Sequence, residues 1–75
     1  MPTENKEEVV LPDGAVYKGQ WKNNMKHGIG VQIWPDGAKY EGEWKWDKAN
    51  GKGKFTHAKG DVYDGEWLDD KVFNF

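Results

Sequence analysis

The amino-acid sequence predicts an all-β protein, an antiparallel sheet of consecutive β-hairpins with no helix to cover it. The pattern Gly-x-x-Tyr-x-Gly-x-Trp occurs three times, beginning at Gly14, Gly37 and Gly60, so that the chain repeats every 23 residues. Within each copy the residues alternate with the two-residue period of a strand. No window has a helical period of useful length, because Gly or Pro interrupts every dozen residues or so up to Gly65.

The repeat period sets the expected domain organisation. A Gly-x-Gly sequence at residues 28–30 recurs at residues 51–53, again 23 residues further on. Repeats of this kind bury their apolar faces by stacking on their neighbours. We therefore expect a disordered or polar segment over residues 1–7 and a repeat domain over residues 8–75. The expected parts of that domain are a half unit at 8–13, full units at 14–36 and 37–59, and a partial unit at 60–75.

Alternation of side chains predicts the strands in order. Ala15–Trp21 is the first strand, with Tyr17 on the same face as its last residue. Gly28–Trp34 is the second strand, and β-branched residues dominate the face opposite to its tryptophan. The equivalent strands in the following units are expected at about Ala38–Trp44, Gly51–His57 and Asp61–Trp67.

Two kinds of connection are predicted between these strands. Pro12-Asp13-Gly14 and Pro35-Asp36-Gly37 have the residues of a tight turn, because Pro fixes φ at the first corner and Gly tolerates positive φ. The other connection, Lys22 to His27, reads as a longer loop in which two Asn residues supply a left-handed conformation.

The glycines within the units are expected to be structural. A missing side chain between Tyr and Trp on one face leaves space for an aromatic ring to lie flat on the strand. Rings that cover glycine backbone would supply the core, each burying about 150–250 Å². The glycines between Tyr and Trp are Gly19, Gly42 and Gly65. The full set expected to be structural is Gly19, Gly28, Gly30, Gly42, Gly51, Gly53 and Gly65.

Composition argues against several classes of protein. A chain of 75 residues buries only a small core, and with no cysteine it has neither disulfides nor thiolate metal sites. No stretch approaches the roughly 20 apolar residues needed to cross a bilayer. The net charge of -2 argues against nucleic-acid binding, which usually requires a basic patch. We expect a cytoplasmic protein with no nucleic-acid partner.

Residues suited to catalysis are also missing from the sequence. His27 and His57 are the only histidines and are not spaced as a metal site, and the chain has no serine or cysteine nucleophile. Paired acids such as Asp69-Asp70 are more often solubilising than catalytic. We expect no enzyme activity, no catalytic residue, no cofactor and no metal.

The recurring glycines and aromatics resemble the MORN repeat (membrane occupation and recognition nexus), whose pattern is Tyr-x-Gly-x-Trp/Phe, a short loop, Gly-x-Gly and a closing Asp-Gly. The resemblance covers roughly Leu11 to Lys71. It implies hairpins arranged as an elongated, twisted, single-layer sheet. It also implies a scaffold, because the family occurs in proteins that tether membranes, in cytoskeletal and ciliary proteins, and beside kinase or methyltransferase domains.

The preferred functional hypothesis is a non-catalytic interaction module or scaffold that binds a protein partner through an aromatic sheet face. Uncovered aromatic surface is typical of interaction sites. A core role is favoured for the three tyrosines, whereas Trp46 fits no repeat position and is the better candidate for an exposed contact. The candidate protein-binding residues are Tyr17, Trp21, Trp34, Tyr40, Trp44, Trp46, Tyr63 and Trp67.

An alternative hypothesis is weak binding of anionic phospholipid, either phosphoinositide or phosphatidic acid. The chain would then be an accessory module of a larger protein such as a phosphatidylinositol phosphate kinase. Lysines are concentrated between Lys45 and Lys59, and acids between Asp61 and Asp70. Pairing of these lysines with the acids across strands is the favoured interpretation of the uneven charge. The candidate lipid-binding residues are Lys45, Lys48, Lys52 and Lys54.

Open sheet edges lead to a third expectation. Unpaired edge strands recruit partners or further copies of a chain. The C-terminal run Val72 to Phe75 is apolar and strand-prone. We therefore expect some homodimerisation through edge strands, and we expect membrane or cytoskeleton association as alternatives to a free cytoplasmic location.

Overall fold

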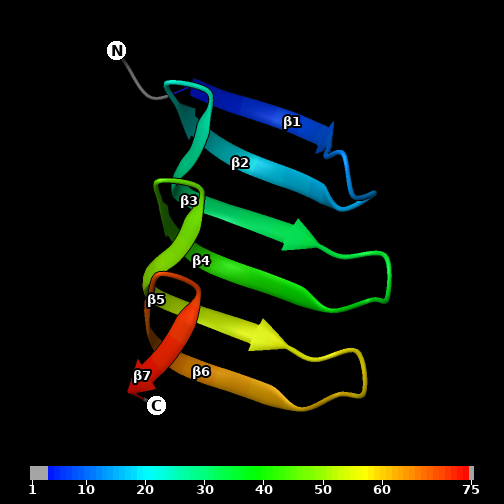
Figure 1. Ribbon diagram of the computed structural model, residues 1–75, viewed down its shortest axis with the longest axis vertical. Coiled ribbons are helices and arrows are strands. Elements are labelled where there is room, and N and C mark those ends of the chain that lie inside the picture. The colour runs from blue at the N-terminus through cyan, green and yellow to red at the C-terminus, as the bar shows by residue number, and fades with distance from the viewer. Residues whose placement is uncertain (1–3, 75) are drawn as a thin grey trace.

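Residues 4–74 of the computed structural model form one antiparallel sheet of seven strands arranged in sequence order (Figure 1). The predicted all-β, single-layer sheet of consecutive hairpins is confirmed for these described residues. The strands are β1 Glu4–Val10, β2 Val16–Lys22, β3 Met25–Ile33, β4 Lys39–Lys45, β5 Lys48–Thr56, β6 Val62–Leu68 and β7 Lys71–Asn74.

Strand β1 is not among the strands that alternation predicts. Residues 4–7, which fall in the segment expected to be disordered or polar, are polar in sequence and belong to this strand. β1 pairs with β2, and Val9 lies opposite Tyr17 and packs against the core. Pairing with β2, rather than any periodicity of its own, therefore makes this polar segment a strand.

The Pro-Asp-Gly connections form the predicted tight turns. The Asp13 Oδ1 atom accepts a hydrogen bond from the Ala15 backbone nitrogen at 2.9 Å, and Asp36 makes the same bond to Ala38 at 2.9 Å. The Gly that closes each turn has a φ of 90° or 95°, which disfavours any residue with a Cβ. These side-chain bonds add to the backbone bonds of the turn, in which the Gly14 nitrogen donates to the Leu11 carbonyl at 2.9 Å and the Gly37 nitrogen donates to the Trp34 carbonyl at 2.9 Å.

The other connections are shorter than predicted, and the expectation of a longer loop over Lys22 to His27 is wrong. β3 begins at Met25, so only Asn23 and Asn24 lie between the strands, with φ values of 52° and 62°. Two successive residues with positive φ form the turn whose twist matches an antiparallel pair. The equivalent residue pairs with positive φ in the next two hairpins are Trp46-Asp47 and Asp69-Asp70.

A row of glycines crosses the sheet at one level. A Cβ at Gly30 would overlap the ring of Tyr17, and a Cβ at Gly53 would overlap the ring of Tyr40. Each tyrosine ring therefore lies directly on the backbone of the next strand. The Tyr17 hydroxyl donates to the backbone carbonyl of Gln20 at 2.9 Å. The cross-strand pairs of this row are Gly19–Gly30, Gly30–Gly42, Gly42–Gly53 and Gly53–Gly65.

The sheet bends just beyond this row. The strand register shifts between Gly19 and Trp21 in the β2–β3 pair, with an equivalent shift in the β4–β5 pair. The Gln20 side chain lies at the first shift, and its Oε1 accepts from the backbone nitrogen of Ile29 at 2.7 Å. Bulges of this kind increase local bending. The ends of the β2–β3, β4–β5 and β6–β7 hairpins, here called the arms, curve over one face of the sheet (Figure 1).

Aspartates tie each arm to the preceding one. The Asp47 Oδ1 atom accepts from the Lys26 backbone nitrogen at 2.6 Å, and the Asp47 nitrogen donates to the Lys26 carbonyl at 3.2 Å. Asp70 makes the same two bonds to Ala49, at 2.7 and 3.0 Å. Asn24 holds the equivalent position in the first arm. The aspartates are therefore the inter-repeat contact of the arms.

The core lies between the arms and the sheet. Aromatic rings contact each other edge to face, with centroids 5.0 Å apart for Tyr40 and Trp44 and 5.4 Å apart for Tyr40 and Trp67. The Trp44 indole nitrogen also donates to the carbonyl of Gly30 at 3.0 Å. Curvature thus lets a single-layer sheet enclose its own core. The buried cluster consists of Tyr17, Trp21, Tyr40, Trp44, Ala49 and Trp67.

Replacing Asp47 by Ala tests the contact between arms, with Asn24→Ala as the matched control. Both changes place Ala at a left-handed turn position, at a cost of roughly 1–2 kcal/mol. Only Asp47→Ala also removes the bond to Lys26, so we expect it to lower the free energy of unfolding by about 1–2 kcal/mol more. Urea denaturation followed by tryptophan fluorescence measures the difference. Equal losses in the two variants would contradict this assignment.

Candidate binding groove

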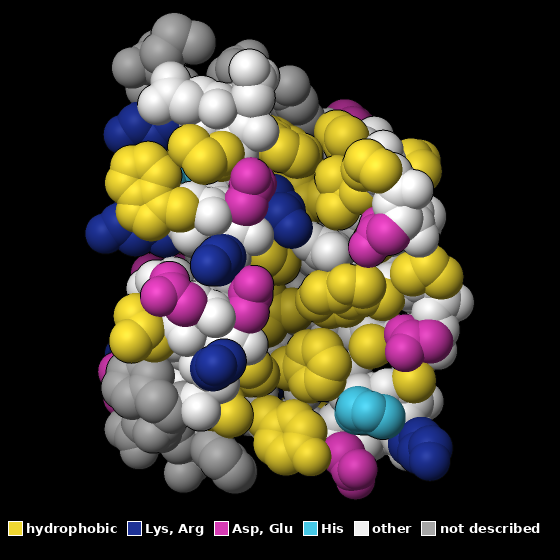
Figure 2. Space-filling view, in the orientation of Figure 1, with side chains coloured by type: hydrophobic (Ala, Val, Ile, Leu, Met, Phe, Trp, Pro, Cys, Tyr) yellow, Lys and Arg dark blue, Asp and Glu magenta, His cyan; other side chains and the backbone are white. Residues whose placement is uncertain are grey.

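A groove of about 640 Å³ runs between the arms and the sheet. Its floor includes Trp34, Phe55 and Tyr63, and its arm side includes Lys26 and Asp70. Hydrophobic side chains gather along this face, with acidic and lysine side chains of the arms beside them (Figure 2). The curvature of the hairpins therefore creates a concave, mostly aromatic surface.

The floor rings are only partly covered. Trp34, Phe55 and Tyr63 are half-buried and pack against the buried cluster. The Phe55 centroid lies 5.9 Å from that of Trp34 and 6.4 Å from that of Tyr63, whose ring is stacked on it. These three rings form a continuous row, which we call the groove row.

The predicted protein-binding residues fall into three groups. Trp34 and Tyr63 belong to the groove row. Trp46 lies outside the groove. The remaining predicted residues are buried in the core, although Tyr40, Trp44 and Trp67 also contribute to the groove lining. The buried residues are Tyr17, Trp21, Tyr40, Trp44 and Trp67.

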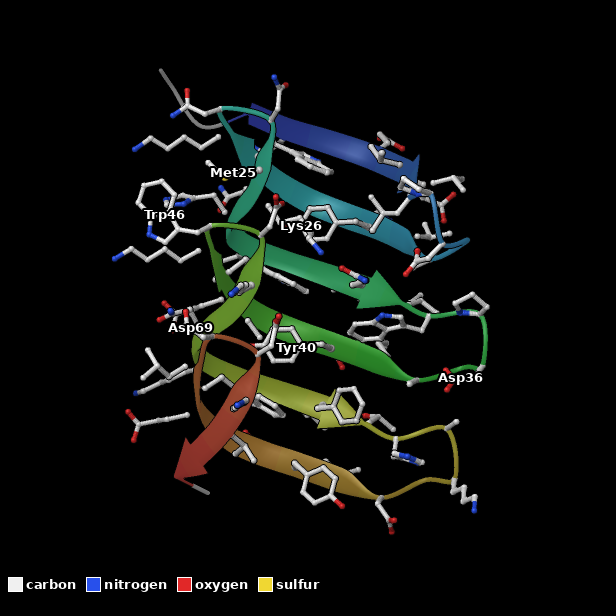
Figure 3. All side chains as sticks on the ribbon, viewed as in Figure 1. Met25, Lys26, Asp36, Tyr40, Trp46 and Asp69 are labelled. Carbon is white, nitrogen blue, oxygen red and sulfur yellow. The ribbon has the colours of Figure 1, made fainter. Side chains whose placement is uncertain are left out.

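Sequence reasoning misses Phe55, Lys26 and Gln32. Phe55 has a signal in the sequence, because it lies two residues after Gly53 on the face that the rings share. Lys26 has no such signal, because only the curvature of the arm brings it over the sheet. Figure 3 shows Lys26 and Tyr40 pointing into the concave side.

Lys26 and Gln32 form a polar pair within the groove. The Lys26 Nζ atom donates to Gln32 Oε1 at 2.6 Å and lies 4.5 Å from the centroid of the Trp44 ring. Burial lowers the pKa of Lys26, and the charges of Asp47 and then Asp70 oppose that change. Ring and carboxylates thus hold a cation in a half-buried position. The equivalent residues 23 positions later are Ala49 and Phe55, so this pair belongs to the first full unit.

Trp46 lies at the first position of the β4–β5 turn, with 56% of its surface exposed, and points away from the groove (Figure 3). Its φ of 55° matches that of Asn23 in the preceding turn. The interpretation that Trp46 fits no repeat position is therefore wrong, because it is the structural equivalent of Asn23. Lys45 and Lys48 face each other across this turn. The centroid of the His27 ring lies 6.4 Å from that of the Trp46 ring.

The four candidate lipid-binding lysines do not form one patch. Two of them flank Trp46, as described above. Lys52 and Lys54 lie on the outer face, opposite to the groove. Lys54 is placed between Glu41 and Asp64 on the neighbouring strands, and Lys52 faces Glu66. Cross-strand acids thus surround the second pair and oppose its attraction to an anionic surface.

Among residues 4–74 no group of three or more His, Cys, Asp or Glu side chains is placed to hold a metal ion. The same residues include no helix with the length and apolar character needed to span a bilayer.

Burial raises the pKa of both Tyr17 and Tyr40 from 10.0 to about 12. The Asp47 charge adds to the effect at Tyr17, and the Glu43 charge adds to the effect at Tyr40. The neutral phenol is therefore part of the folded state, and ionisation competes with the ring contacts on the glycine row.

Alkaline solution is expected to destabilise the fold through these phenols. The unfolded chain ionises them near pH 10, whereas the folded chain keeps both protons until about pH 12. The free energy of unfolding therefore falls with rising pH across that window, by about 1.4 kcal/mol per pH unit for each tyrosine. Urea denaturation at successive alkaline pH values measures the slope. Tyr40→Phe should remove one of the two contributions, and an unchanged slope in that variant would contradict the assignment.

Comparison with known proteins identifies the repeat. The sequence profile of the MORN repeat matches residues 17–39, 40–62 and 63–71. Each match begins at the tyrosine of a unit, and together they extend from β2 into β7. A search of curated proteins found no match. Since the matches cover well over half of the sequence, the chain belongs to the MORN repeat family, whose members are generally non-catalytic modules.

Proposed function

We propose that this chain is a non-catalytic binding module that holds an extended segment of a protein partner in its groove. The observation that carries the proposal is the groove row, whose three half-buried rings line an open volume of about 640 Å³. Concave aromatic surfaces with a few polar groups are typical of ligand sites. Aromatic side chains also supply large contact areas at a small cost in conformational entropy.

The spacing of the row predicts the size of the bound segment. Trp34 follows β3, and Tyr63 lies in β6, three strands further along the sheet. Along the row the ring centroids are 5.9 Å and 6.4 Å apart, so the row extends over at most about 12 Å. An extended chain spans about 3.5 Å per residue, so about four residues cover the row. We expect apolar side chains at alternate positions of this short segment.

Lys26 and Gln32 place polar groups at the β3 end of the groove row, and Lys71 also lines the groove. The Lys26 ammonium group and the Gln32 side chain lie beside Trp34. The next unit has Ala49 at the position of Lys26 and Phe55 at the position of Gln32, so it lacks this polar pair. A partner segment with an oxygen-bearing side chain at one end and apolar side chains along the rest fits this arrangement.

Selection from a random peptide library against the immobilised chain provides a ligand for the test. Tyr63→Ala removes one ring of the groove row, and we expect it to weaken the selected peptides about tenfold, a loss of about 1.4 kcal/mol. Val62→Ala is the matched control, because the adjacent side chain points to the opposite face. Fluorescence titration measures both variants after denaturation confirms their folding. Peptides that bind both variants equally, or a library that yields none, would count against the groove.

A second candidate function is weak binding of anionic phospholipid at the β4–β5 turn. The observation that favours it is Trp46, exposed between Lys45 and Lys48. Tryptophan partitions to the membrane interface, and each lysine near an anionic surface contributes about 1 kcal/mol. The chain would then act as an accessory module of a larger protein such as a phosphatidylinositol phosphate kinase, with a cytoplasmic site at a membrane.

Two double variants separate the lysines in a vesicle test. We expect Lys45→Glu/Lys48→Glu to abolish sedimentation with vesicles that contain phosphatidylinositol bisphosphate. Lys52→Glu/Lys54→Glu, which makes the same charge change on the outer face, should retain most of the binding. Neutral phosphatidylcholine vesicles and a series of salt concentrations complete the measurement. Equal losses in both variants would show that only net charge matters, and no binding by the unaltered chain would exclude the lipid function.

A further inference from the structure

The outer face of the sheet carries an apolar patch over β1, β2 and β3. Val10 is opposite Val16 in the strand register, and Val16 is opposite Ile33. Ile29 and Val31 continue the same face along β3. The exposed fractions are 72% for Val10, 60% for Ile29 and 45% for Ile33. These five residues are the outer patch, and it lies on the side opposite to the groove.

The next repeat shows that folding does not require this patch. β3 and β5 are equivalent strands of nine residues each. Ile29 faces Glu43 on the following strand, just as its counterpart Lys52 faces Glu66. The residues at the positions of Ile29, Val31 and Ile33 are Lys52, Lys54 and Thr56. The same local structure therefore forms with polar side chains, so the exposed aliphatic residues of the first unit have another use.

We propose that the outer patch joins two copies of this chain, with their sheets stacked back to back. β-branched side chains on a sheet face are the usual lining between two stacked sheets about 10 Å apart. Charges of both signs border the patch, because Lys18 lies between Glu8 and Val31, and Glu41 is opposite Val31 on the other side. A two-fold axis can place the lysine of one copy near a glutamate of the other. An anionic membrane would instead meet repulsion from these acids.

The edges are less suited to joining two copies than this face. β7 pairs only with Glu66, Trp67 and Leu68 among residues 4–74, which leaves the first part of β6 as an open edge. That edge carries Asp61 and Asp64, while β1 at the other end carries Glu7 and Glu8. Pairing of this first part of β6 with the Glu7 and Glu8 end of β1 would bring like charges together across the new ladder.

Two properties of the pair follow from the position of the outer patch. Five aliphatic side chains from each copy bury less surface than the roughly 800 Å² per partner of a stable interface. The association is therefore weak and reversible. Both grooves remain open, because they lie on the faces that point away from each other. The pair therefore presents two grooves at a fixed separation, which raises the avidity for a partner with two matching segments.

Sedimentation velocity over a range of concentrations, up to millimolar, tests the proposal. We expect the weight-average mass of the unaltered chain to rise from the monomer value of 8.6 kDa toward twice that value. Ile29→Lys/Val31→Lys copies the residues of the next repeat and should remain monomeric throughout. Val62→Lys/Leu68→Lys is the control, because it adds the same charge at two exposed apolar residues of β6 and should still dimerise. Ile33→Thr, which copies Thr56, is a milder second variant and should shift the midpoint to higher concentration.

Three results would overturn the proposal. The first is an unaltered chain that stays monomeric over the whole range. The second is a dimer that persists in Ile29→Lys/Val31→Lys, which would place the contact at the edges. The third is an equal loss in the Val62→Lys/Leu68→Lys control, which would attribute association to net charge. Peptide binding in the groove is measured separately, so its failure and the failure of dimerisation are distinguishable.

Discussion

The contact between a tyrosine ring and the glycine backbone of the neighbouring strand determines the shape of this molecule. The rings of Tyr17 and Tyr40 occupy the space that a Cβ would fill at Gly30 and Gly53. Each hydroxyl then reaches the carbonyl of the residue at the register shift, Gln20 or Glu43. The bend, the curved arms and the enclosed aromatic core all follow from this contact. The groove exists because a single-layer sheet has folded its own hairpin ends over one face.

Much of the fold is predictable because the period and the alternation are local properties of the sequence. Strands β2 to β6 and the Pro-Asp-Gly turns follow from them. β1 does not, because residues 4–8 have no apolar period, and their strand depends on pairing with β2. The bonds of Asp47 and Asp70 to the preceding arm are equally invisible, since they join residues 21 positions apart only after the arms have curved.

The candidate site is less predictable than the fold, because equivalent residues of different units have different neighbours. Tyr40 is buried under edge-on contacts from Trp44 and Trp67, whereas Tyr63 is only half-buried at the end of the row. Repeat position alone therefore does not distinguish a core ring from a groove ring. Lys26 is a second example, because its place over the Trp44 ring depends on the curvature of its arm. Sequence alternation assigns a face, and the number of flanking units decides how much of that face stays open.

The aspartates that connect the arms bond only to main-chain atoms of the preceding arm. The side chain at that position is consequently free to change, and within this one chain it is Lys26, Ala49 and then Val72. All three line the groove. At this residue position the backbone thus makes the contact between the arms, while the side chain belongs to the groove lining. In an array of this kind the side chain at this position can be replaced in one arm at a time. Each replacement changes the groove lining, while the aspartate bonds between the arms are retained.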